Sequence, residues 1–249
     1  MSALSLQNVD LTLGDTRVLD DITLHVNTGE FVSILGPSGA GKSSLFRVLT
    51  GAVAHDGGTV QLNGSPPARD AFAFMPQRDA LLPWRRIIDN VTLGLEVQGM
   101  PRAAARARVT PLLGEFGLDG FARHYPAQLS GGMRQRAALL RTVVQDRPIQ
   151  LLDEPFGALD ALTRMTLQRW LEQRWQSARW TTLLITHDVR EAVALSDRIY
   201  VLSRRPARVI AEFTVTAPRP RLGRPLPPEA VRLEADLLET LLTQTGETP

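Results

Sequence analysis

The sequence contains no cysteine and no uninterrupted apolar run of membrane-spanning length. The absence of cysteine excludes disulfides, thiolate metal ligands and a thiol nucleophile, and it suits a reducing compartment. No run approaches the ~20 apolar residues that a membrane helix needs. The first residues have neither a basic segment nor an apolar core, so we expect no signal peptide. We therefore expect a soluble chain, which leaves docking on a membrane partner open.

The chain also lacks a marked excess of one charge. Its 28 lysines and arginines against 26 aspartates and glutamates give a formal net charge of +2. Two short arginine clusters stand out, Arg102/Arg106/Arg108 and Arg219/Arg221/Arg224. We interpret both as solvated faces, because basic residues are otherwise spread among carboxylates. This balance does not indicate nucleic acid as a partner.

The most informative stretch of the chain is a glycine-rich octapeptide that follows the apolar run 31–35. Its residues are Gly36, Pro37, Ser38, Gly39, Ala40, Gly41, Lys42 and Ser43. It matches G-x-x-x-x-G-K-[ST], between a predicted buried strand and an amphipathic helix over 44–50. The glycines let backbone N–H groups approach phosphate oxygens, and the helix start adds the positive end of its dipole. Lys42 is placed to reach the β- and γ-phosphates and the Ser43 hydroxyl to ligate Mg²⁺. We predict a nucleoside triphosphate site; a glycine-rich turn that binds nothing is the minor alternative.

The apolar pattern predicts an α/β fold. Alternation at Val9, Leu11 and Leu13, and again at Ile22, Leu24 and Val26, indicates antiparallel strands. Further strands are expected at 59–63, 71–75, 149–152, 182–186 and 198–202, with helices over 161–174 and 229–242. Between about 87 and 144 the pattern is helical, punctuated by Pro101, Pro111 and Gly117. The strand–helix alternation predicts a parallel sheet.

Two adjacent carboxylates, Asp153 and Glu154, end the predicted strand at 149–152. Asp153 is placed to support Mg²⁺, and Glu154 to activate or orient an attacking water. In isolation, two adjacent carboxylates are more often a solvated helix cap. Because a complete phosphate loop precedes them in this chain, we favour a role in the nucleotide site. Gln150 interrupts the apolar run before them, and its amide needs partners if it is buried.

A second motif, Leu129-Ser-Gly-Gly-Met133, precedes a helical run over 137–144. Ser130 has the chemistry of an N-cap, and Gly131 and Gly132 expose N–H groups at a positive helix end. This string resembles the L-S-G-G-Q signature of the ATP-binding-cassette (ABC) ATPases. The resemblance extends over about residues 4–215, with the motifs in the family's order: the phosphate loop, Gln77, the signature, Asp153-Glu154, Ala158-Leu159-Asp160 and His187.

This resemblance implies a P-loop NTPase (RecA-like) core with an N-terminal antiparallel β subdomain and an inserted α-helical subdomain. The nucleotide-binding domain would span 1–217, with helices over about 86–146, followed by a Pro/Arg-rich segment and helix over 218–249. The implied activity is ATP hydrolysis with Mg²⁺ by a head-to-tail dimer of two copies.

The family also implies roles for single residues. ATP would lie between the phosphate loop with Ser44, Leu13 and Val18 of one copy and the signature of the other, Ser130, Gly131, Gly132 and Met133. Mg²⁺ would be held by Ser43, Gln77 and Asp153. Gln77 would also count among the catalytic residues and report to the partner copy. Glu154 would be the base, His187 would hold the γ-phosphate, and Asp160 would cross the dimer interface.

A finer resemblance rests on Gln77-Arg-Asp-Ala-Leu-Leu-Pro-Trp84 with Asn90-Val91, on Met133 in place of the signature Gln, and on Ser203-Arg-Arg-Pro206. These features resemble importer ATPases for nitrate, sulfonate, taurine or pyrimidine precursors. They imply integral membrane permease subunits as partners, a solute-binding protein indirectly, and a cytoplasmic position on the inner face of the cell membrane. An apolar rim at Leu82 and Trp84 would grip a helix of the permease; alternatively, Trp84 packs inside the helical subdomain.

One departure from the family concerns the nucleotide base. The family usually has an aromatic residue near position 13, whereas this chain has Leu13. Stacking on an aromatic ring is worth ~1–3 kcal/mol per base. We therefore hypothesise comparable affinity for ATP and GTP.

Two other functions share the phosphate loop. A chromosome- or repair-type ABC ATPase acting on DNA usually inserts a long coiled coil or zinc modules before the signature, but here the interval is short, without heptads or cysteine. A small-molecule kinase has no reason to carry Leu-Ser-Gly-Gly. The sequence favours an importer ATPase and leaves its solute undetermined.

Overall fold

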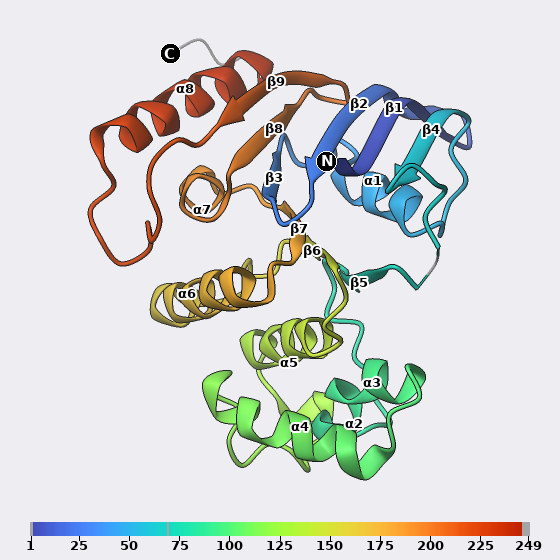
Figure 1. Cartoon of the computed structure of the whole chain (residues 1–249), viewed down its shortest axis with the longest axis vertical. Helices are drawn as coiled ribbons and strands as arrows, with labels where there is room; N and C mark the ends of the chain where they lie inside the picture. The colour runs from blue at the N-terminus through green and yellow to red at the C-terminus, as the bar shows by residue number, and fades with distance from the viewer. Residues whose placement is uncertain (1, 69, 246–249) are drawn as a thin grey trace.

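The chain folds into two β-sheets with helices packed around them and a helical lobe at the bottom of the view in Figure 1. This computed structural model describes residues 2–68 and 70–245. The strands are β1 (Ser2–Leu13), β2 (Thr16–Asn27), β3 (Phe31–Leu35), β4 (Gly57–Leu62), β5 (Phe72–Met75), β6 (Ile149–Asp153), β7 (Thr181–Ile185), β8 (Arg198–Leu202) and β9 (Val209–Thr214). The helices are α1 (Lys42–Leu49), α2 (Ile87–Val91), α3 (Leu93–Val97), α4 (Arg102–Glu115), the 3₁₀ turn η1 (Pro126–Gln128), α5 (Gly131–Val143), α6 (Ala161–Ala178), α7 (Val189–Leu195) and α8 (Pro228–Thr245). The predicted α/β class is confirmed.

The smaller sheet is antiparallel and has the strand order β2-β1-β4. Residues along β2 alternate between buried and exposed, because one face packs on the core and the other faces solvent. Leu6 and Leu24 pair across β1 and β2, and both side chains are buried. The two predicted antiparallel strands are present, and both extend beyond the predicted residues.

The larger sheet has the order β5-β6-β7-β3-β8-β9, and β3 pairs in parallel with β7 and β8. Every residue of β3 is buried, as expected for a parallel strand covered on both faces. β6 lies in register beside β7, with Asp153 opposite Ile185. The carboxyl ends of β3, β6 and β7 therefore meet at one edge of the sheet. The segments that carry Gly36, Glu154 and His187 all leave from this edge.

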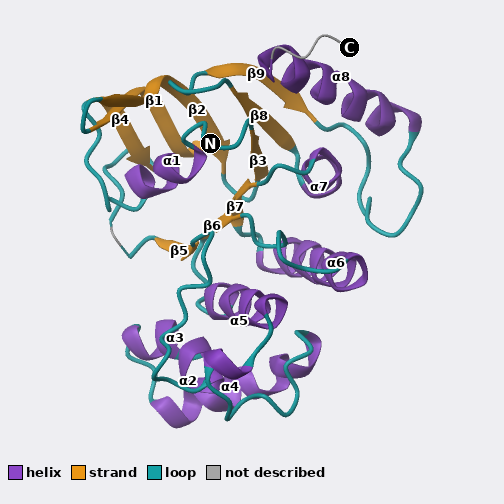
Figure 2. Cartoon of the chain, turned by 180° about the vertical axis from the view of Figure 1, so that it is seen from behind, coloured by secondary structure: helices purple, strands orange, loops and turns teal. Residues whose placement is uncertain are grey.

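Between β5 and β6 the chain forms α2 to α5, the helical lobe visible in both cartoon views (Figures 1 and 2). α5 joins this lobe to the sheet, since Leu139 and Leu140 share one buried cluster with Met75 of β5 and Leu152 of β6. The predicted helical block is present, with one difference. Pro111 lies inside α4 rather than interrupting it. Pro111 is exposed, so the carbonyl that loses its N–H partner can be hydrated.

Two elements, β9 and α7, were not predicted from the sequence. β9 is an edge strand that pairs antiparallel with β8, and its residues are alternately exposed and only half-buried. An edge strand of this kind has a weak apolar signal. α7 has seven residues, six of them buried, so it shows no polar face and too little length to reveal a helical period.

α8 packs against α7 and covers one side of the larger sheet (Figure 2). Ala230 and Leu237 of α8 are fully buried in this contact. The predicted helix over 229–242 is thus present and slightly longer. Residues 246–249 of the predicted C-terminal segment lie outside the described residues.

The segment before α8 is held by the buried Arg221 and the half-buried Arg219, so the expected solvated face at 219–224 is wrong for two of its three members. Arg221 is 5% exposed. Its guanidinium donates to the carbonyl oxygens of Val193, Ser196, Val215 and Ala217. Arg219 pairs with Glu172 and Asp197 and lies over the Trp175 ring. These arginines anchor the segment to the core.

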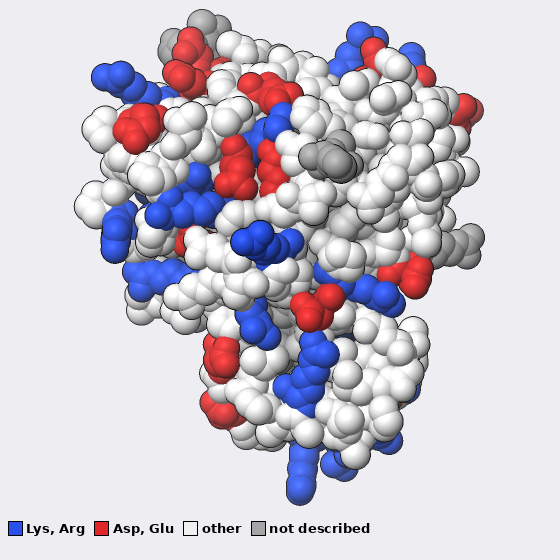
Figure 3. All heavy atoms as spheres, in the orientation of Figure 1, with Lys and Arg blue, Asp and Glu red and all other residues white. Residues whose placement is uncertain are grey.

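Positive and negative side chains are interspersed over the face shown in Figure 3. In the first arginine cluster, Arg102 and Arg108 are exposed, as expected, and Arg106 is half-buried. All three form ion pairs, Arg102 and Arg106 with Asp89 and Arg108 with Asp146. In the described part of the chain, no helix has both the length and the apolar character that crossing a bilayer requires.

Candidate functional site

The phosphate loop leaves the carboxyl end of β3 and runs into α1. Gly39 has φ +74° and Gly41 has φ +121°, conformations that residues with a Cβ rarely adopt. A Cβ atom at Gly41 would lie 2.9 Å from Cγ1 of Val18, which is buried on β2. Both the backbone and the packing therefore require glycine at position 41, so the motif spacing has a steric cause in this fold.

Lys42 begins α1 and is almost completely buried under the loop. Its Nζ donates to the carbonyl oxygens of Gly36 and Pro37 at 2.7 and 2.8 Å. Burial lowers the pKa of Lys42, and the nearby carboxylates of Glu154 and Asp153 act in the opposite direction. A cation is thus held between the phosphate loop and the acidic pair.

Asp153 is the last residue of β6 and is 2% exposed. Burial raises its pKa to about 6, although the Ser43 hydroxyl hydrogen-bonds to the carboxylate and opposes the shift. Its Oδ1 atom is buried and has no hydrogen-bond partner. A buried carboxylate oxygen without a partner, beside a hydroxyl, is suited to a hard cation such as Mg²⁺. Because the described residues contain no group of three or more His, Asp or Glu side chains arranged to hold a metal ion, such an ion needs further oxygen ligands, which phosphates supply.

Glu154 and His187 converge because β6 and β7 are neighbours in the sheet. Glu154 follows β6, and its amide donates to the Ile185 carbonyl oxygen of β7 at 2.9 Å. Its Oε2 lies 3.4 Å from Nδ1 of His187. The His187 side chain is 65% exposed, so it can reach a ligand bound at this edge. The structure therefore places two of the three predicted catalytic side chains, Glu154 and His187, together.

A pocket of about 190 Å³ lies over the phosphate loop. Besides loop residues 38–44 it is lined by Gln77, Glu154 and Arg205, so the predicted Gln77 is part of the site. Arg205 was not predicted to be there. Its guanidinium donates to the Gly39 carbonyl oxygen at 2.7 Å. The sequence offered only the string Ser203-Arg-Arg-Pro206, whose position beside the loop depends on the turn after β8.

The signature residues lie elsewhere in the same copy. The Ser130 hydroxyl caps α5 by accepting from the Met133 amide at 3.3 Å, as its N-cap chemistry predicted. None of residues 130–133 lines the pocket over the phosphate loop. Asp160 is exposed and caps α6, accepting from the Thr163 amide at 3.0 Å. One copy therefore does not bring the signature or Asp160 to its own phosphate loop.

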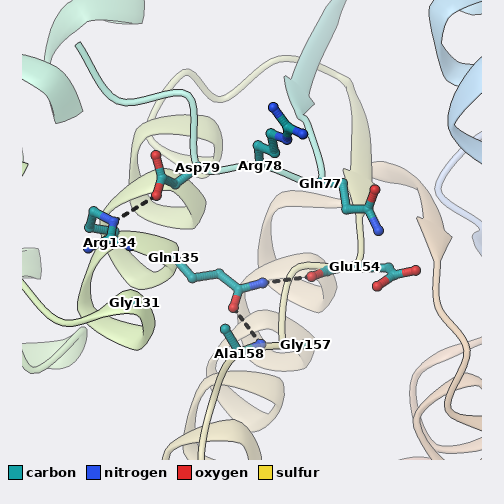
Figure 4. A pocket seen from close by; sticks show the side chains of 9 residues that line it. All are labelled: Gln77, Arg78, Asp79, Gly131, Arg134, Gln135, Glu154, Gly157 and Ala158. Carbon is teal, nitrogen blue, oxygen red and sulfur yellow. Dashed lines mark hydrogen bonds and ion pairs between the residues drawn. The ribbon is translucent and has the colours of Figure 1, made fainter. Parts of the chain in front are cut away.

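A second, open pocket of about 420 Å³ lies between the Gln77 loop, the start of α5 and the Glu154 turn (Figure 4). Gly131, Arg134 and Gln135 line it from α5. Gln135 is buried and hydrogen-bonds to the turn that carries Glu154. It was not predicted as a site residue, because its partner is distant in the sequence.

The Leu82–Trp84 rim is exposed, and the alternative in which Trp84 packs inside the helical lobe is wrong. The Trp84 side chain is 72% exposed. The rim is held by Asn90, which is fully buried. Its Nδ2 donates to the Leu82 carbonyl oxygen at 3.1 Å, and its Oδ1 accepts from the Leu82 amide at 2.7 Å.

Comparison with known proteins agrees with this arrangement. The family model described as ABC transporter matches residues 19–157, more than half of the chain. The chain belongs to the ABC transporter family. It is 42% identical to the aliphatic sulfonates import ATP-binding protein SsuB of Pseudomonas fluorescens, over 99% of this chain and 89% of that protein. It is 45% identical to SsuB 1 of Agrobacterium fabrum, over 96% and 83%.

Its structure is also similar to a solved ABC cassette, the dimeric post-hydrolysis state of MJ0796 bound to ADP and Pi. The TM-score is 0.77 at 29% identity, covering 85% of this chain and 98% of that one. The predicted fold class, ATPase activity and use of ATP with Mg²⁺ are confirmed. The importer prediction is confirmed over the DNA-acting alternative, because these ABC relatives are named as import ATP-binding proteins.

Proposed function

We propose that this ABC ATPase works as a dimer that couples ATP hydrolysis to the uptake of a small anionic solute, with an organosulfonate as the best supported choice. The observation that carries the proposal is that Asp153 and Glu154 lie beside Lys42 of the phosphate loop, with His187 next to Glu154. Residues 130–133 of the same copy, by contrast, do not line the pocket over that loop. The sulfonate assignment is supported by the names of the relatives, which describe aliphatic sulfonate import.

Within one site, each residue has a role that follows from its position. The phosphate-loop N–H groups and Lys42 bind the β- and γ-phosphates. Ser43, Gln77 and Asp153 would hold Mg²⁺, and the bound ion would neutralise part of the phosphate charge. Glu154 orients and polarises the attacking water, and His187 holds the γ-phosphate. Leu13 provides an apolar contact for the nucleotide, whereas Val18, also expected to contact it, is buried against Gly41 and supports the loop.

The second half of the site comes from the partner copy. Ser130 and Gly131 are exposed at the start of α5, where free N–H groups and the helix dipole favour a phosphate. In a head-to-tail dimer, this end faces the γ-phosphate bound by the other copy, and Asp160 lies in the interface. The dimeric structure of the related cassette supports this arrangement.

The membrane partner docks on the helical side of the molecule. The exposed Trp84 and the half-buried Leu82 form an apolar rim next to the Gln77 loop, which suits a helix of a permease subunit. Residues 1–217 then act as the nucleotide-binding domain, with helices over about 86–146 as the docking side and 218–249 as an appended segment. The chain would sit on the cytoplasmic face of the cell membrane, and a solute-binding protein would deliver the solute to the permease.

The catalytic part of the proposal is tested with two variants. E154Q should bind ATP and accumulate as a dimer with turnover reduced by about 10²-fold or more, whereas K42A should lose productive nucleotide binding. Steady-state ATPase assays, nucleotide titration and size-exclusion chromatography with ATP provide the readouts. Hydrolysis by E154Q at the native rate would refute the base assignment. A monomer with full activity that is insensitive to substitution of Gly131 would refute the composite site.

The transport part needs the native membrane subunits. The complex is isolated through the ATPase, reconstituted with its solute-binding protein, and tested with sulfonates, taurine, nitrate and pyrimidine precursors. We expect a sulfonate to raise the ATPase rate most. Stimulation by nitrate or a pyrimidine precursor alone would overturn the solute assignment.

A further inference from the structure

Gln135 joins the signature helix to the turn that carries Glu154. It lies in α5 one turn after the signature, and its side chain is 8% exposed. Its Nε2 donates to the Glu154 carbonyl oxygen at 2.7 Å, and its Oε1 accepts from the Ala158 amide at 2.7 Å. Figure 4 shows this side chain reaching from α5 to both ends of the turn. One amide group therefore bridges the first and last residues of the Glu154–Ala158 segment.

The turn that Gln135 bridges contains a residue in an unfavourable backbone conformation. Glu154 has φ +49°, in the left-handed region that residues with a Cβ seldom occupy. Such a conformation persists only where surrounding contacts hold it. Within the turn itself, the Gly157 amide donates to the Glu154 carbonyl oxygen at a longer 3.3 Å. Two tertiary contacts thus hold the backbone of Glu154: its amide donates to the Ile185 carbonyl oxygen at 2.9 Å, and its carbonyl oxygen accepts the shorter bond from Gln135.

The backbone conformation of Glu154 sets the direction of its carboxylate. In Figure 4 that carboxylate points away from Gln135, on the side where Gln77 lies. Gln135 itself does not line the pocket over the phosphate loop. Its route to the phosphate loop of its own copy therefore runs through Glu154.

The neighbouring residue Arg134 connects α5 to the Gln77 loop instead of the Glu154 turn. Its Nε donates to Asp79 at 2.9 Å, two residues after Gln77, and its Nη1 donates to the Leu129 carbonyl oxygen. Successive residues of α5 thus contact the Gln77 loop and the Glu154 turn. A displacement of the start of α5 is transmitted to both.

We propose that Gln135 is a positioning residue that holds Glu154 in its left-handed conformation. Through this contact, the direction of the Glu154 carboxylate depends on the position of the signature helix α5. This rests on the proposed role of Glu154 in activating water. Removing the amide should lower the turnover number and leave ATP affinity nearly unchanged, because no atom of Gln135 lies at the phosphate loop.

The principal test compares Q135M with Q145M in the full-length protein. Methionine keeps the approximate length of the side chain and removes both hydrogen bonds. Gln145 is a matched control: it lies two residues beyond the other end of α5, and its side-chain amide donates to the Arg141 carbonyl oxygen of that helix rather than to another element. We expect kcat of Q135M to fall about 10- to 100-fold, as for a misplaced catalytic group, with KM and ATP affinity within about twofold. Q145M should have native kcat.

A second variant separates positioning from simple loss of stability. In Q135E one carboxylate oxygen can still accept from the Ala158 amide, but the other would face the Glu154 carbonyl oxygen unless it carries a proton. Protonation restores the donor, so the ratio of Q135E to native kcat should rise as the pH is lowered from about 8 to 6. The charged groups around this position are Glu154 on the turn, Arg134 on α5, and Arg78 and Asp79 on the Gln77 loop. Burial near Glu154 and Asp79 favours the protonated form.

The outcomes are distinguishable. Native kcat in Q135M would overturn the inference. So would a loss in Q135M that is matched by reduced ATP affinity and melting temperature, with no pH-dependent recovery in Q135E. If E154Q hydrolyses ATP normally, the proposed base is wrong; if E154Q is inactive while Q135M is native, only the positioning role fails.

Discussion

Oε2 of Glu154 lies 3.4 Å from Nδ1 of His187, although the two residues follow different strands. The distance results from the pairing of β6 with β7, in which Asp153 stands opposite Ile185. Glu154 is partly shielded, whereas His187 projects into solvent. The carboxylate is thus fixed near the sheet while the imidazole is free to contact a bound phosphate.

H187A should reduce turnover more than binding. Loss of a group that contacts the transferring phosphoryl is expected to lower kcat by about 10²-fold or more, whereas the phosphate loop that binds ATP is untouched. Steady-state kinetics and nucleotide titration measure the two effects. H55A serves as the control, because within the described residues the His55 ring forms a local hydrogen bond with the Gly57 carbonyl oxygen. Turnover by H187A close to that of H55A would contradict the role.

L13Y should strengthen binding of the nucleotide base. Leu13 is half-buried at the end of the β1–β2 hairpin and offers an apolar contact without a ring. An aromatic face there should gain ~1–3 kcal/mol of stacking. We expect the native protein to bind ATP and GTP with similar affinity, measured by competition against a fluorescent analogue. Strong ATP preference in the native protein, or no gain in L13Y, would refute this hypothesis.

The stability of the fold should decrease as the pH rises through the pKa of Glu191. Burial raises the pKa of Glu191 from the ordinary 4.5 to about 7, although hydrogen bonds from Thr186 and Gln168 oppose the shift. Between these values the folded state holds a proton that the unfolded chain has released, so the free energy of unfolding falls with rising pH. The effect of this group is about 3 kcal/mol at most.

E191Q keeps the shape of the side chain and removes the titration. The free energy of unfolding of E191Q, measured by urea denaturation, should therefore increase relative to that of the native protein from about pH 5 to pH 8. A constant difference between the two proteins across this range would show that Glu191 does not titrate there.

R221M should destabilise the fold, because it leaves several buried carbonyl oxygens without a donor. Burial lowers the pKa of Arg221 to about 10, which does not remove its charge at neutral pH. Loss of its hydrogen bonds should lower the free energy of unfolding by about 2–4 kcal/mol. Arg224 in the same segment is exposed, so R224M should change stability by less than about 0.5 kcal/mol. Equal effects of the two substitutions would contradict the anchoring role.

Some features could be read from the sequence because they depend on contiguous residues. The phosphate loop binds through its own backbone, and its glycines are required where they stand, as Gly41 beside Val18 illustrates. The strand over 31–35 is apolar at almost every position because both of its faces are covered. The cap at Ser130 is likewise a contact over three residues.

Other features depend on which strands and helices become neighbours. Nothing near Gln135 in the sequence reveals its bond to Glu154, and nothing near Arg221 reveals its bonds to Val193 and Ser196, since these partners lie on other elements. Gln150 is fully buried, and its Nε2 donates to the Arg147 carbonyl while its Oε1 has no partner. The exposure of Trp84 was also undecided from the sequence.

The sequence by itself determined the phosphate-binding chemistry, the order of the motifs and the α/β class, because each is encoded by local spacing and apolar periodicity. Only the tertiary structure decided that Glu154 meets His187, that Gln135 holds the Glu154 turn, and that the signature lies away from the phosphate loop of its own copy. The physical reason is that hydrogen bonds and charge pairs act over a few ångströms in space. Sheet order and helix packing, rather than spacing along the chain, bring those groups together.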